Sequence, residues 1–220
     1  MQPDLSCPCC DNMRDLSGFP SRIPIGTASG IFQITTCPQC THSWLVTAQD
    51  QHHQVEEIYD HDYAGHRIDK TFEMKCREAL MLDISPHMPP PACLLDVGCG
   101  NGSFVLAAQE AGYDTLGIDI SEEGVAFAVS RGANAHHYDF LTHAFDKKFD
   151  IITMWDVVEH LHSPAIFIHR ARELLKPGGI LIIKTPSIGK LCLLFVRLFG
   201  NSAPALLQAP DHIHYWTRSS

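Results

Sequence analysis

The stretch Cys93-Leu94-Leu95-Asp96-Val97-Gly98-Cys99-Gly100-Asn101-Gly102 decides the fold that this sequence predicts. It begins with a short apolar run that stops at a glycine, which is typical of a buried strand in a parallel sheet. The glycines that follow let the backbone adopt positive φ and let a ligand approach the main chain closely. The stretch therefore predicts a buried strand that leads into a ligand-binding loop.

Downstream of this loop, apolar runs alternate with helical patterns. We expect one helix to end at Gly112, a second to be capped by Ser121, and a third to stop before Lys176-Pro177-Gly178-Gly179. The predicted strands cover residues 93–97, 115–119, 133–138, 149–154 and 180–185, and the predicted helices cover residues 103–111, 121–130 and 164–175. This alternation predicts an α/β fold, a Rossmann-like doubly wound parallel sheet with right-handed crossovers.

The N-terminal residues 1–48 differ from the rest because they hold five of the nine cysteines. Setting Cys9 aside leaves two Cys-x-x-Cys pairs, and four thiolates presented in this way bind zinc well. A metal would also supply folding energy that so short a segment cannot obtain from a small core. Cys9 and His42 are alternative ligands, and reduced cysteines without a metal are the other interpretation. We predict a zinc ribbon with a structural Zn²⁺ whose ligands are Cys7, Cys10, Cys37 and Cys40.

Residues 49–91 are predicted to form a helical connector. Phe72, Cys76 and Leu80 follow a helical period, and Pro89-Pro90-Pro91 closes the segment. A rigid turn at the prolines would then lead into the parallel sheet.

Residues 92–220 form the predicted doubly wound domain. The chain stops at Trp216-Thr217-Arg218-Ser219-Ser220, where a Thr or Ser is expected to cap another helix. We therefore expect that this domain is incomplete at its C-terminus and lacks its last helix and strands.

The composition disfavours several classes of function. The sequence holds 25 acidic and 16 basic side chains, a formal net charge of −9, which disfavours binding to nucleic acid. The first residues lack the basic and apolar regions of a secretory signal, and the apolar run 191–199 is too short to span a bilayer. We expect a cytoplasmic protein with reduced cysteines and no transmembrane segment, and with residues 189–199 as a site of peripheral contact. No oligomeric state is predicted.

Two aspartates follow the second and third predicted strands. Asp119 stands 17 residues after Gly102, at a strand end where a carboxylate can accept the hydroxyls of a ribose. Asp139 follows the third strand, where it can accept a hydrogen bond from an adenine amine. The alternatives are a turn residue for Asp119 and a solvated loop acid for Asp139. Together with the glycine loop, their order favours a nucleotide-like cofactor.

Asp96 distinguishes between two such cofactors. The dinucleotide fingerprint is Gly-x-Gly-x-x-Gly, whereas this loop reads Gly-x-Gly-x-Gly with Asp96 two residues ahead. A carboxylate there would repel a pyrophosphate but suits a ligand with an ammonium and a sulfonium. The charge argument therefore favours S-adenosylmethionine (SAM) over NAD.

Four segments in order resemble the motifs of class I SAM-dependent methyltransferases, and the resemblance covers residues 92–186. The segments are Leu94-Leu95-Asp96-Val97-Gly98-Cys99-Gly100-Asn101-Gly102, Gly117-Ile118-Asp119-Ile120-Ser121, residues 149–161 and Leu174-Leu175-Lys176-Pro177-Gly178-Gly179. The resemblance implies that the glycines line the methionine portion of SAM, that Asp119 holds the ribose, and that Asp139 and Phe140 flank the adenine. The predicted cofactor-binding residues are Asp96, Gly98, Gly100, Gly102, Asp119, Ile120, Asp139, Phe140 and Trp155.

Asp156, Glu159 and His160 follow the fourth predicted strand and are the candidate catalytic residues. If a helical turn starts at Asp156, the three side chains share one face. His160 is then the candidate general base, since its reference pKa of about 6.5 allows it to take a proton near neutral pH. A divalent ion held by the three side chains and plain packing roles are the alternatives. The segment resembles the Glu-His-Leu stretch of ubiquinone-biosynthesis O-methyltransferases, which allows either chemical role.

Methyltransferases preceded by a zinc ribbon are a known arrangement, associated with sugar, cell-surface or secondary-metabolite pathways. We predict SAM-dependent methyl transfer, in particular O-methylation, to a small molecule such as a sugar, a quinone or a lipid-linked metabolite. Residues 59–63 resemble a tyrosine-containing segment of such proteins that caps the cofactor cleft, and a plain helix face is the alternative. His212 or His214 is expected to face the substrate. An NAD-dependent oxidoreductase and a non-catalytic zinc-ribbon module that merely binds SAM are the alternative functions.

Overall fold

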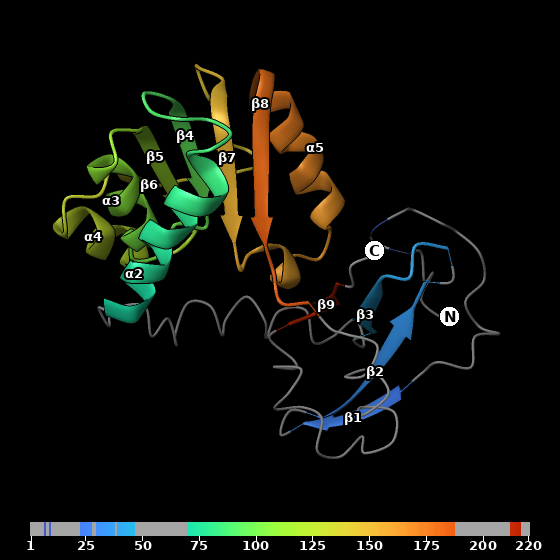
Figure 1. Ribbon diagram of the computed structural model, residues 1–220. Helices are drawn as coiled ribbons and strands as arrows, with labels where there is room; N and C mark the ends of the chain where they lie inside the picture. Colours follow the sequence, from blue (N-terminus) through green and yellow to red (C-terminus); the bar gives the residue numbers. More distant parts are fainter. Residues whose placement is uncertain are drawn as a thin grey trace. The chain divides into compact units, whose positions relative to one another are not determined.

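The computed structural model describes residues 7, 9, 23–27, 30–37, 39–46, 70–187 and 212–216. The chain divides into two compact units that interleave along the sequence. The first unit comprises Met1–Glu57, Val158–Ile166 and Thr185–Ser220, and the second comprises Ile58–Val157 and Phe167–Lys184. Each unit contains one sheet, antiparallel in the first unit and parallel in the second (Figure 1).

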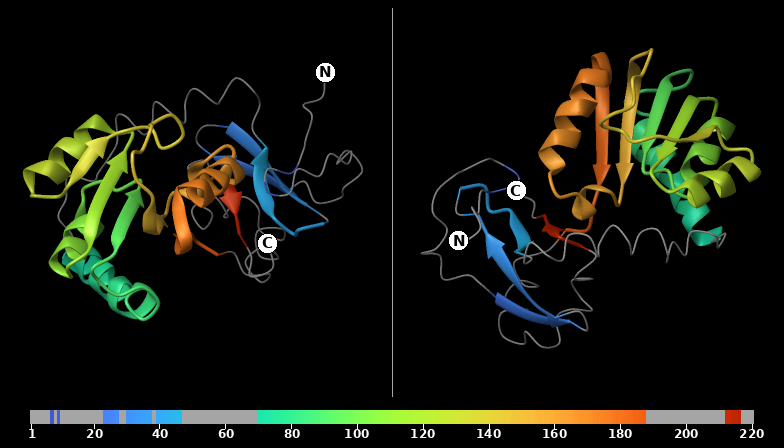
Figure 2. Two further views of the ribbon diagram at one scale, coloured as in Figure 1. Left: turned by 90° about the horizontal axis from the view of Figure 1, so that it is seen from above. Right: turned by 180° about the vertical axis from the view of Figure 1, so that it is seen from behind.

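The parallel sheet has five strands that alternate with helices along the chain. The strands are β4 (Cys93–Val97), β5 (Asp114–Asp119), β6 (Ala135–His137), β7 (Phe149–Trp155) and β8 (Leu175–Lys184), and the helices are α3 (Ser103–Glu110), α4 (Glu122–Ser130) and α5 (Pro164–Leu174). Their order is β6-β5-β4-β7-β8, with β4 at the centre. The chain runs from β4 through β5 to β6 toward one edge of the sheet, and from β7 to β8 toward the other edge. Right-handed crossovers therefore place α5 on the face opposite α3 and α4 (Figure 2).

These elements confirm the predicted Rossmann-like parallel sheet, with differences at its two edges. β6 is shorter than predicted, and β8 begins at Leu175 rather than at Ile180. Phe149 and Ile151 of β7 pair with Leu175 and Ile180, so the predicted turn Lys176-Pro177-Gly178-Gly179 bulges out of the ladder instead of preceding the strand.

α2 (Lys70–Ala79) and a π-helical turn, η4 (Leu80–Ile84), confirm the helix predicted within residues 49–91. Cys76, Leu80 and Ile84 are buried and belong to the same apolar cluster as Leu94 and Phe104. This cluster packs α2 beside α3 against the strand that leads into the glycine loop.

The antiparallel sheet contains β1 (Ile23–Thr27), β2 (Gly30–Thr36), β3 (Ser43–Val46) and β9 (His214–Tyr215). β1 and β2 form a hairpin that lies between the two predicted cysteine pairs in the sequence. β9 was not predicted. It pairs with β3 through Ser43 and Trp44, so a segment near the end of the sequence completes a sheet formed near its beginning.

Several predictions concern residues outside the described ranges. They are Cys10, the tyrosine segment 59–63, the apolar run 191–199 and the chain end 217–220. In the part of the chain that the structure describes, no helix combines the length and the apolar character that a bilayer crossing requires.

Candidate functional site

The glycine loop connects β4 to α3 at the carboxyl end of the central strand. Gly98, Gly100 and Gly102 have φ of 75°, 50° and 74°, in the left-handed region that favours glycine. A Cβ at Gly98 would lie 2.6 Å from Cγ2 of Val157, and one at Gly102 would lie 2.7 Å from Cβ of Ala128. At Gly98 and Gly102, close packing therefore excludes a side chain, and the backbone conformation independently favours glycine.

Asp119 ends β5, and two backbone amides hold its side chain beside this loop. Its Oδ2 accepts a hydrogen bond from the N–H of Gly100 at 2.8 Å, and its Oδ1 accepts one from the N–H of Ser121 at 2.9 Å. Ser121 also caps α4, as predicted, because its Oγ accepts from the N–H of Gly124 at 3.1 Å. Since each carboxylate oxygen accepts more than one hydrogen bond, Asp119 retains acceptor capacity for ligand hydroxyls.

Asp96 is a second carboxyl group at this end of the sheet, and it is only 1% exposed. Thr153 of β7 donates a hydrogen bond from Oγ1 to Oδ1 of Asp96 at 2.7 Å. Burial raises the pKa of Asp96 to about 7 against the effect of the Thr153 hydrogen bond, and the charge of Asp119 adds to the rise. A cation beside Asp96 would favour its charged form. Thr153 was not predicted, because its register with Asp96 is apparent only in the structure.

The predicted adenine-binding residues differ in their exposure. Ile120 is 67% exposed, whereas Phe140 is 3% exposed and its ring centre lies 5.6 Å from that of Phe167. Asp139 is exposed, and its Oδ1 accepts hydrogen bonds from two following backbone N–H groups at 2.7 and 3.0 Å. Asp139 therefore caps a turn, Phe140 belongs to the core, and Ile120 presents an apolar side chain to solvent.

Trp155 is the last residue of β7 and is partly buried. Its ring packs against Phe104 of α3, with 4.9 Å between the ring centres. Trp155 therefore lies on the face of the sheet that α3 covers, next to the apolar cluster.

Asp156, Glu159 and His160 do not share the helical face that was predicted. Asp156 has φ of 52°, outside the helical region, and the 3₁₀ turn η5 begins only at Val158 (Val158–His160). The backbone N–H of Asp156 donates to the carbonyl of Lys184 at 2.8 Å, so the chain turns sharply where β7 ends instead of starting a helix. Asp156 belongs to the unit of the parallel sheet, whereas Glu159 and His160 belong to the other unit.

Glu159 and His160 instead form a cluster with His212. One ligand atom from each side chain lies within 4.8 Å of the other two. Glu159 is buried, and the rings of His160 and His212 meet edge to face with their centres 4.8 Å apart. The N–H of Ile213 donates to the carbonyl of Glu159 at 2.9 Å, which holds the two segments together. A carboxylate with two imidazoles is suited to proton transfer or to a divalent cation.

Cys7, Cys37 and Cys40 lie together, with their sulfur atoms within 4.8 Å of one another. The Sγ atoms of Cys7 and Cys40 are 3.6 Å apart, too far for a disulfide. Two thiolates on one tetrahedral zinc ion, with Zn–S bonds of about 2.3 Å, lie about 3.8 Å apart, so the spacing fits this metal. Cys9 packs against the cluster, and the fourth predicted ligand, Cys10, is outside the described residues.

His42, the other alternative ligand, pairs with a histidine 172 residues away. Its Nε2 lies 2.8 Å from Nδ1 of His214, and Nε2 of His214 lies 2.6 Å from the carbonyl oxygen of Leu161. Because a carbonyl only accepts, His214 donates to Leu161 and accepts from His42. Burial lowers the pKa of His42 to about 3 and that of His214 to about 4, so both rings are neutral near pH 7. No pattern in the sequence predicted this pair.

Comparisons with known proteins agree with the fold. A family model described as "Methyltransferase domain" matches residues 63–220. The ubiquinone biosynthesis O-methyltransferase of Hydrogenovibrio crunogenus is 33% identical over 100 residues, which cover 42% of this chain and 42% of that protein. The protein of the same description from Alkalilimnicola ehrlichii is 30% identical over 131 residues, which cover 56% of this chain and 52% of that protein. The chain thus spans about half the length of the curated relatives that it matches.

Among solved structures, the YcgJ protein from Bacillus subtilis is similar with a TM-score of 0.53 and 23% sequence identity. The match covers 64% of this chain and 63% of that chain. This similarity supports the fold alone.

Proposed function

We propose that this chain, which belongs to the methyltransferase domain family, binds SAM at the glycine loop and transfers a methyl group to a small-molecule acceptor. The observation that carries the proposal is the pair of carboxyl groups, Asp96 and Asp119, on adjacent strands beside that loop. The pair offers acceptors for ribose hydroxyls and a counter-charge for a cationic ligand.

The residues around the loop fit SAM better than a dinucleotide. A pyrophosphate would be repelled by Asp96, whereas an ammonium and a sulfonium would favour the charged form of its buried carboxyl group. SAM supplies an electrophilic methyl group, and the task of the chain is to bind and align the two reactants. Asp119 would hold the ribose, and Ile120 would offer an apolar surface to the adenine. We assign to the same site Gly98, Gly100, Gly102, Asp139, Phe140 and Trp155.

For an acceptor that must lose a proton, we propose His160 as the general base. Glu159 and His212 lie close enough to orient its ring or to hold a divalent cation with it. Asp156 would contact the cofactor, since it directly follows the neighbouring strand β7. Loss of turnover in His160→Gln with unchanged SAM affinity would support the base, whereas turnover that chelation abolishes and Mg²⁺ restores would support the cation.

We propose that residues 1–48 form a zinc ribbon, that residues 49–91 connect it to the catalytic domain, and that residues 92–220 form that domain. The three clustered sulfurs of Cys7, Cys37 and Cys40 support a tetrahedral zinc site with Cys10 as the fourth ligand. Such a metal would be structural, because four thiolates leave no open position for a substrate.

The relatives bear on the class of acceptor. Those reported are ubiquinone biosynthesis O-methyltransferases, which supports O-methylation of a small molecule. We therefore propose a quinone, a sugar or a lipid-linked metabolite as the acceptor, in a cytoplasmic setting.

Calorimetry with SAM and with NADH tests the cofactor. We expect micromolar binding of SAM and at least tenfold weaker binding by Asp119→Asn, because the loss of a charged acceptor costs about 1.5–3 kcal/mol. Asp114→Asn is the matched control, since Asp114 lies at the opposite end of β5 and pairs with Lys147 on the surface. Binding of NADH without binding of SAM would reject the proposal in favour of an oxidoreductase. SAM binding with one zinc per chain and no turnover of any acceptor would favour the non-catalytic module.

A further inference from the structure

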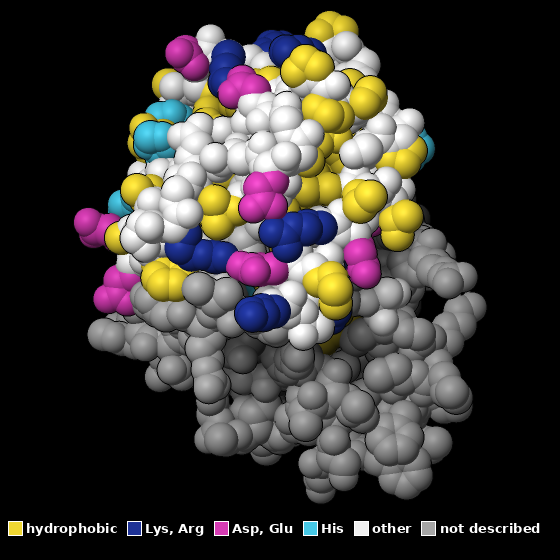
Figure 3. Space-filling view, turned by 60° about the vertical axis from the view of Figure 1, so that its left-hand side comes forward, with side chains coloured by type: hydrophobic (Ala, Val, Ile, Leu, Met, Phe, Trp, Pro, Cys, Tyr) yellow, Lys and Arg dark blue, Asp and Glu magenta, His cyan; other side chains and the backbone are white. Residues whose placement is uncertain are grey.

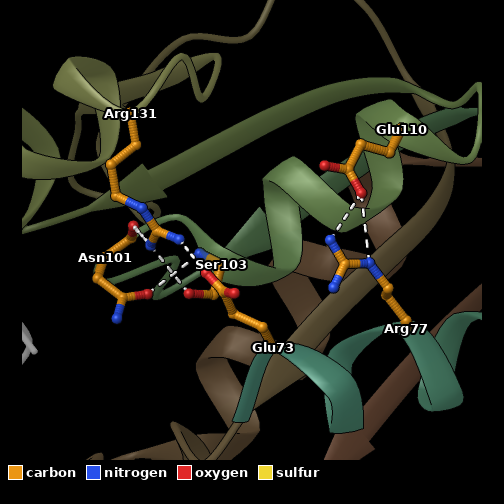
Figure 4. A network of polar contacts seen from close by, with 6 residues as sticks. All are labelled: Glu73, Arg77, Asn101, Ser103, Glu110 and Arg131. Carbon is orange, nitrogen blue, oxygen red and sulfur yellow. Dashed lines mark hydrogen bonds and ion pairs between the residues drawn. The ribbon is translucent and has the colours of Figure 1, made fainter. Parts of the chain in front are cut away.

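Arg131 directly follows α4 and reaches three other segments with one guanidinium group (Figure 4). Its Nη1 donates to the carbonyl oxygen of Asn101 at 2.9 Å and to Oγ of Ser103 at 3.0 Å. Its Nη2 forms an ion pair with Glu73 of α2. A single side chain thus joins the glycine loop, the first turn of α3 and α2.

A second arginine, Arg77 of α2, provides a comparison in the same view. Arg77 pairs with Glu110 of α3 at 2.9 Å, and the two side chains are 53% and 61% exposed (Figure 4). The side chains of Arg131 and Glu73 are only 13% and 24% exposed. Exposed pairs contribute little because water screens them, whereas hydrogen bonds from a charged donor gain strength where water is excluded. Figure 3 shows a face on which exposed acidic and basic side chains lie close together in this way.

The peptide group that Arg131 holds lies at the centre of the loop. Asn101 stands between Gly100 and Gly102, which both have positive φ. The N–H of Gly102 donates to the carbonyl of Cys99 at 2.9 Å, and the N–H of Gly100 donates to Asp119. By binding the carbonyl of Asn101, Arg131 fixes the orientation of the Asn101–Gly102 peptide, two peptide groups after the amide that binds Asp119.

The end of α4 that carries Arg131 also packs directly on the loop. A Cβ at Gly102 would lie 2.7 Å from Cβ of Ala128 and 2.8 Å from Cβ of Ala133. Apolar contact with Ala128 and Ala133, together with the guanidinium of Arg131, therefore leaves this part of the loop little freedom to change its conformation.

We infer that Arg131, oriented by Glu73, is a positioning residue that holds the glycine loop in the conformation that receives the methionine portion of SAM. The inference rests on the proposed function, in which that loop contacts this portion. Arg131 does not need to touch SAM for this role, because it acts through the carbonyl of Asn101.

The experiment compares two ligands by calorimetry. SAM has the methionine portion, and 5′-methylthioadenosine has the nucleoside but lacks that portion. For Arg131→Gln we expect about tenfold weaker binding of SAM and a change of less than about twofold for 5′-methylthioadenosine, because the lost hydrogen bonds come from a charged donor. Arg131→Lys keeps the charge without the forked geometry and should fall in between. Glu73→Gln should show a smaller change in the same direction, and Arg77→Gln should change neither affinity.

Amide hydrogen exchange gives a readout that does not need SAM. In Arg131→Gln, the amides of Gly100 and Gly102 should exchange faster than in the wild type, with the amides of β4 unchanged. Equal weakening of both ligands, or no weakening of either with unchanged exchange, would overturn the inference. If the wild type does not bind SAM, the proposed function fails, and the exchange rates still decide whether Arg131 holds the loop.

Discussion

The parallel sheet and the antiparallel sheet bury different kinds of side chain. Beside β4 the buried cluster is almost entirely apolar and includes Leu94, Phe104 and Ile151. In and beside the antiparallel sheet the buried residues include Cys37, His42 and other thiol, imidazole and aromatic groups. Apolar burial stabilises the parallel sheet without a further ligand. The thiols and imidazoles of the antiparallel sheet change their charge with metal and pH.

Because of this difference, the two units should respond differently to metal removal and to pH. Conditions that act on metal binding and on protonation should affect the antiparallel sheet and leave the parallel sheet folded. The three tryptophans allow the units to be followed separately, because Trp44 and Trp216 lie in the first unit and Trp155 lies in the second.

The largest expected effect is that of Cys37→Ser. A structural zinc ion contributes about 10–16 kcal/mol of binding free energy in small zinc peptides, so the loss of one thiolate should unfold the first unit. We expect zinc content to fall from about one per chain to near zero and the first unit to become sensitive to protease, while SAM still binds. Metal analysis, limited proteolysis and calorimetry measure the three quantities. Cys93→Ser, in β4, is the matched control and should retain its zinc.

If wild-type protein purified without chelator contains no zinc, the antiparallel sheet does not depend on a metal, and this difference between the two sheets is refuted. The cysteine cluster would then be a packed group of reduced thiols, and Cys37→Ser would cost only the contacts that Cys37 makes with Trp44 and its neighbours.

Acidification should move the stabilities of the two units in opposite directions. His42 and His214 have folded pKa values of about 3 and about 4, below the unfolded value of 6.5, so the unfolded state takes up protons first as the pH falls. Below pH 6.5 each histidine should therefore cost the first unit about 1.4 kcal/mol per pH unit. Asp96 has the opposite sign, since its folded pKa of about 7 exceeds the unfolded value of 3.8, and the second unit gains stability as the pH falls from 7 to 4.

Denaturant unfolding at pH 7 and pH 5 tests this expectation. Trp155→Phe leaves two fluorophores that report on the first unit, and the double variant Trp44→Phe and Trp216→Phe leaves Trp155 to report on the second. Parallel shifts of both unfolding curves with pH would show that the two units respond alike and would contradict the comparison.

The two sheets also differ in how much the sequence predicted. The parallel sheet follows from apolar runs that stop at turn residues, and Asp96 and Asp119 follow from their places at strand ends. β9 could not be predicted because two residues, His214 and Tyr215, carry no periodic pattern and gain their strand conformation only by pairing with β3. Tertiary contact decides such a short element.

Within the site, the sequence predicted groups at strand ends better than it predicted their partners. Thr153 and Arg131 contact Asp96 and Asn101 across sequence separations of 57 and 30 residues, which no local spacing rule covers. The expected helical face at Asp156 failed for a local reason. The backbone turns through positive φ directly after β7, and only Asn, Asp and Gly adopt this conformation readily.

Gly102→Ala tests how tightly the unit of the parallel sheet is packed at the glycine loop. The new Cβ would meet Ala128 and Ala133 at 2.7 and 2.8 Å and would require φ of 74°. Overpacking and left-handed strain together should lower the free energy of unfolding of the second unit by about 3 kcal/mol. Gly132→Ala is the matched control, because its φ is 94° but nothing lies within 4 Å of the new Cβ. It should cost only the strain of about 1–2 kcal/mol, as measured by denaturant unfolding followed at Trp155. Equal costs for the two variants would show that α4 yields to the new methyl group.

The smallest expected effect links the burial of Asp96 to ligand binding. In the protein without ligand the Asp96 carboxyl group has a pKa of about 7, and only its charged form offers a counter-charge to SAM. As the pH increases toward 7, the affinity for SAM should therefore increase by up to about tenfold per pH unit, and it should level off above pH 7. 5′-Methylthioadenosine carries no ammonium or sulfonium, so its affinity should stay constant over the same range. In Asp96→Asn the dependence on pH should disappear for SAM as well. A pH dependence that persists in this variant would assign the titration to another group. In that case the buried carboxyl group would stabilise the loop through Thr153 and would not recognise the charge of the ligand.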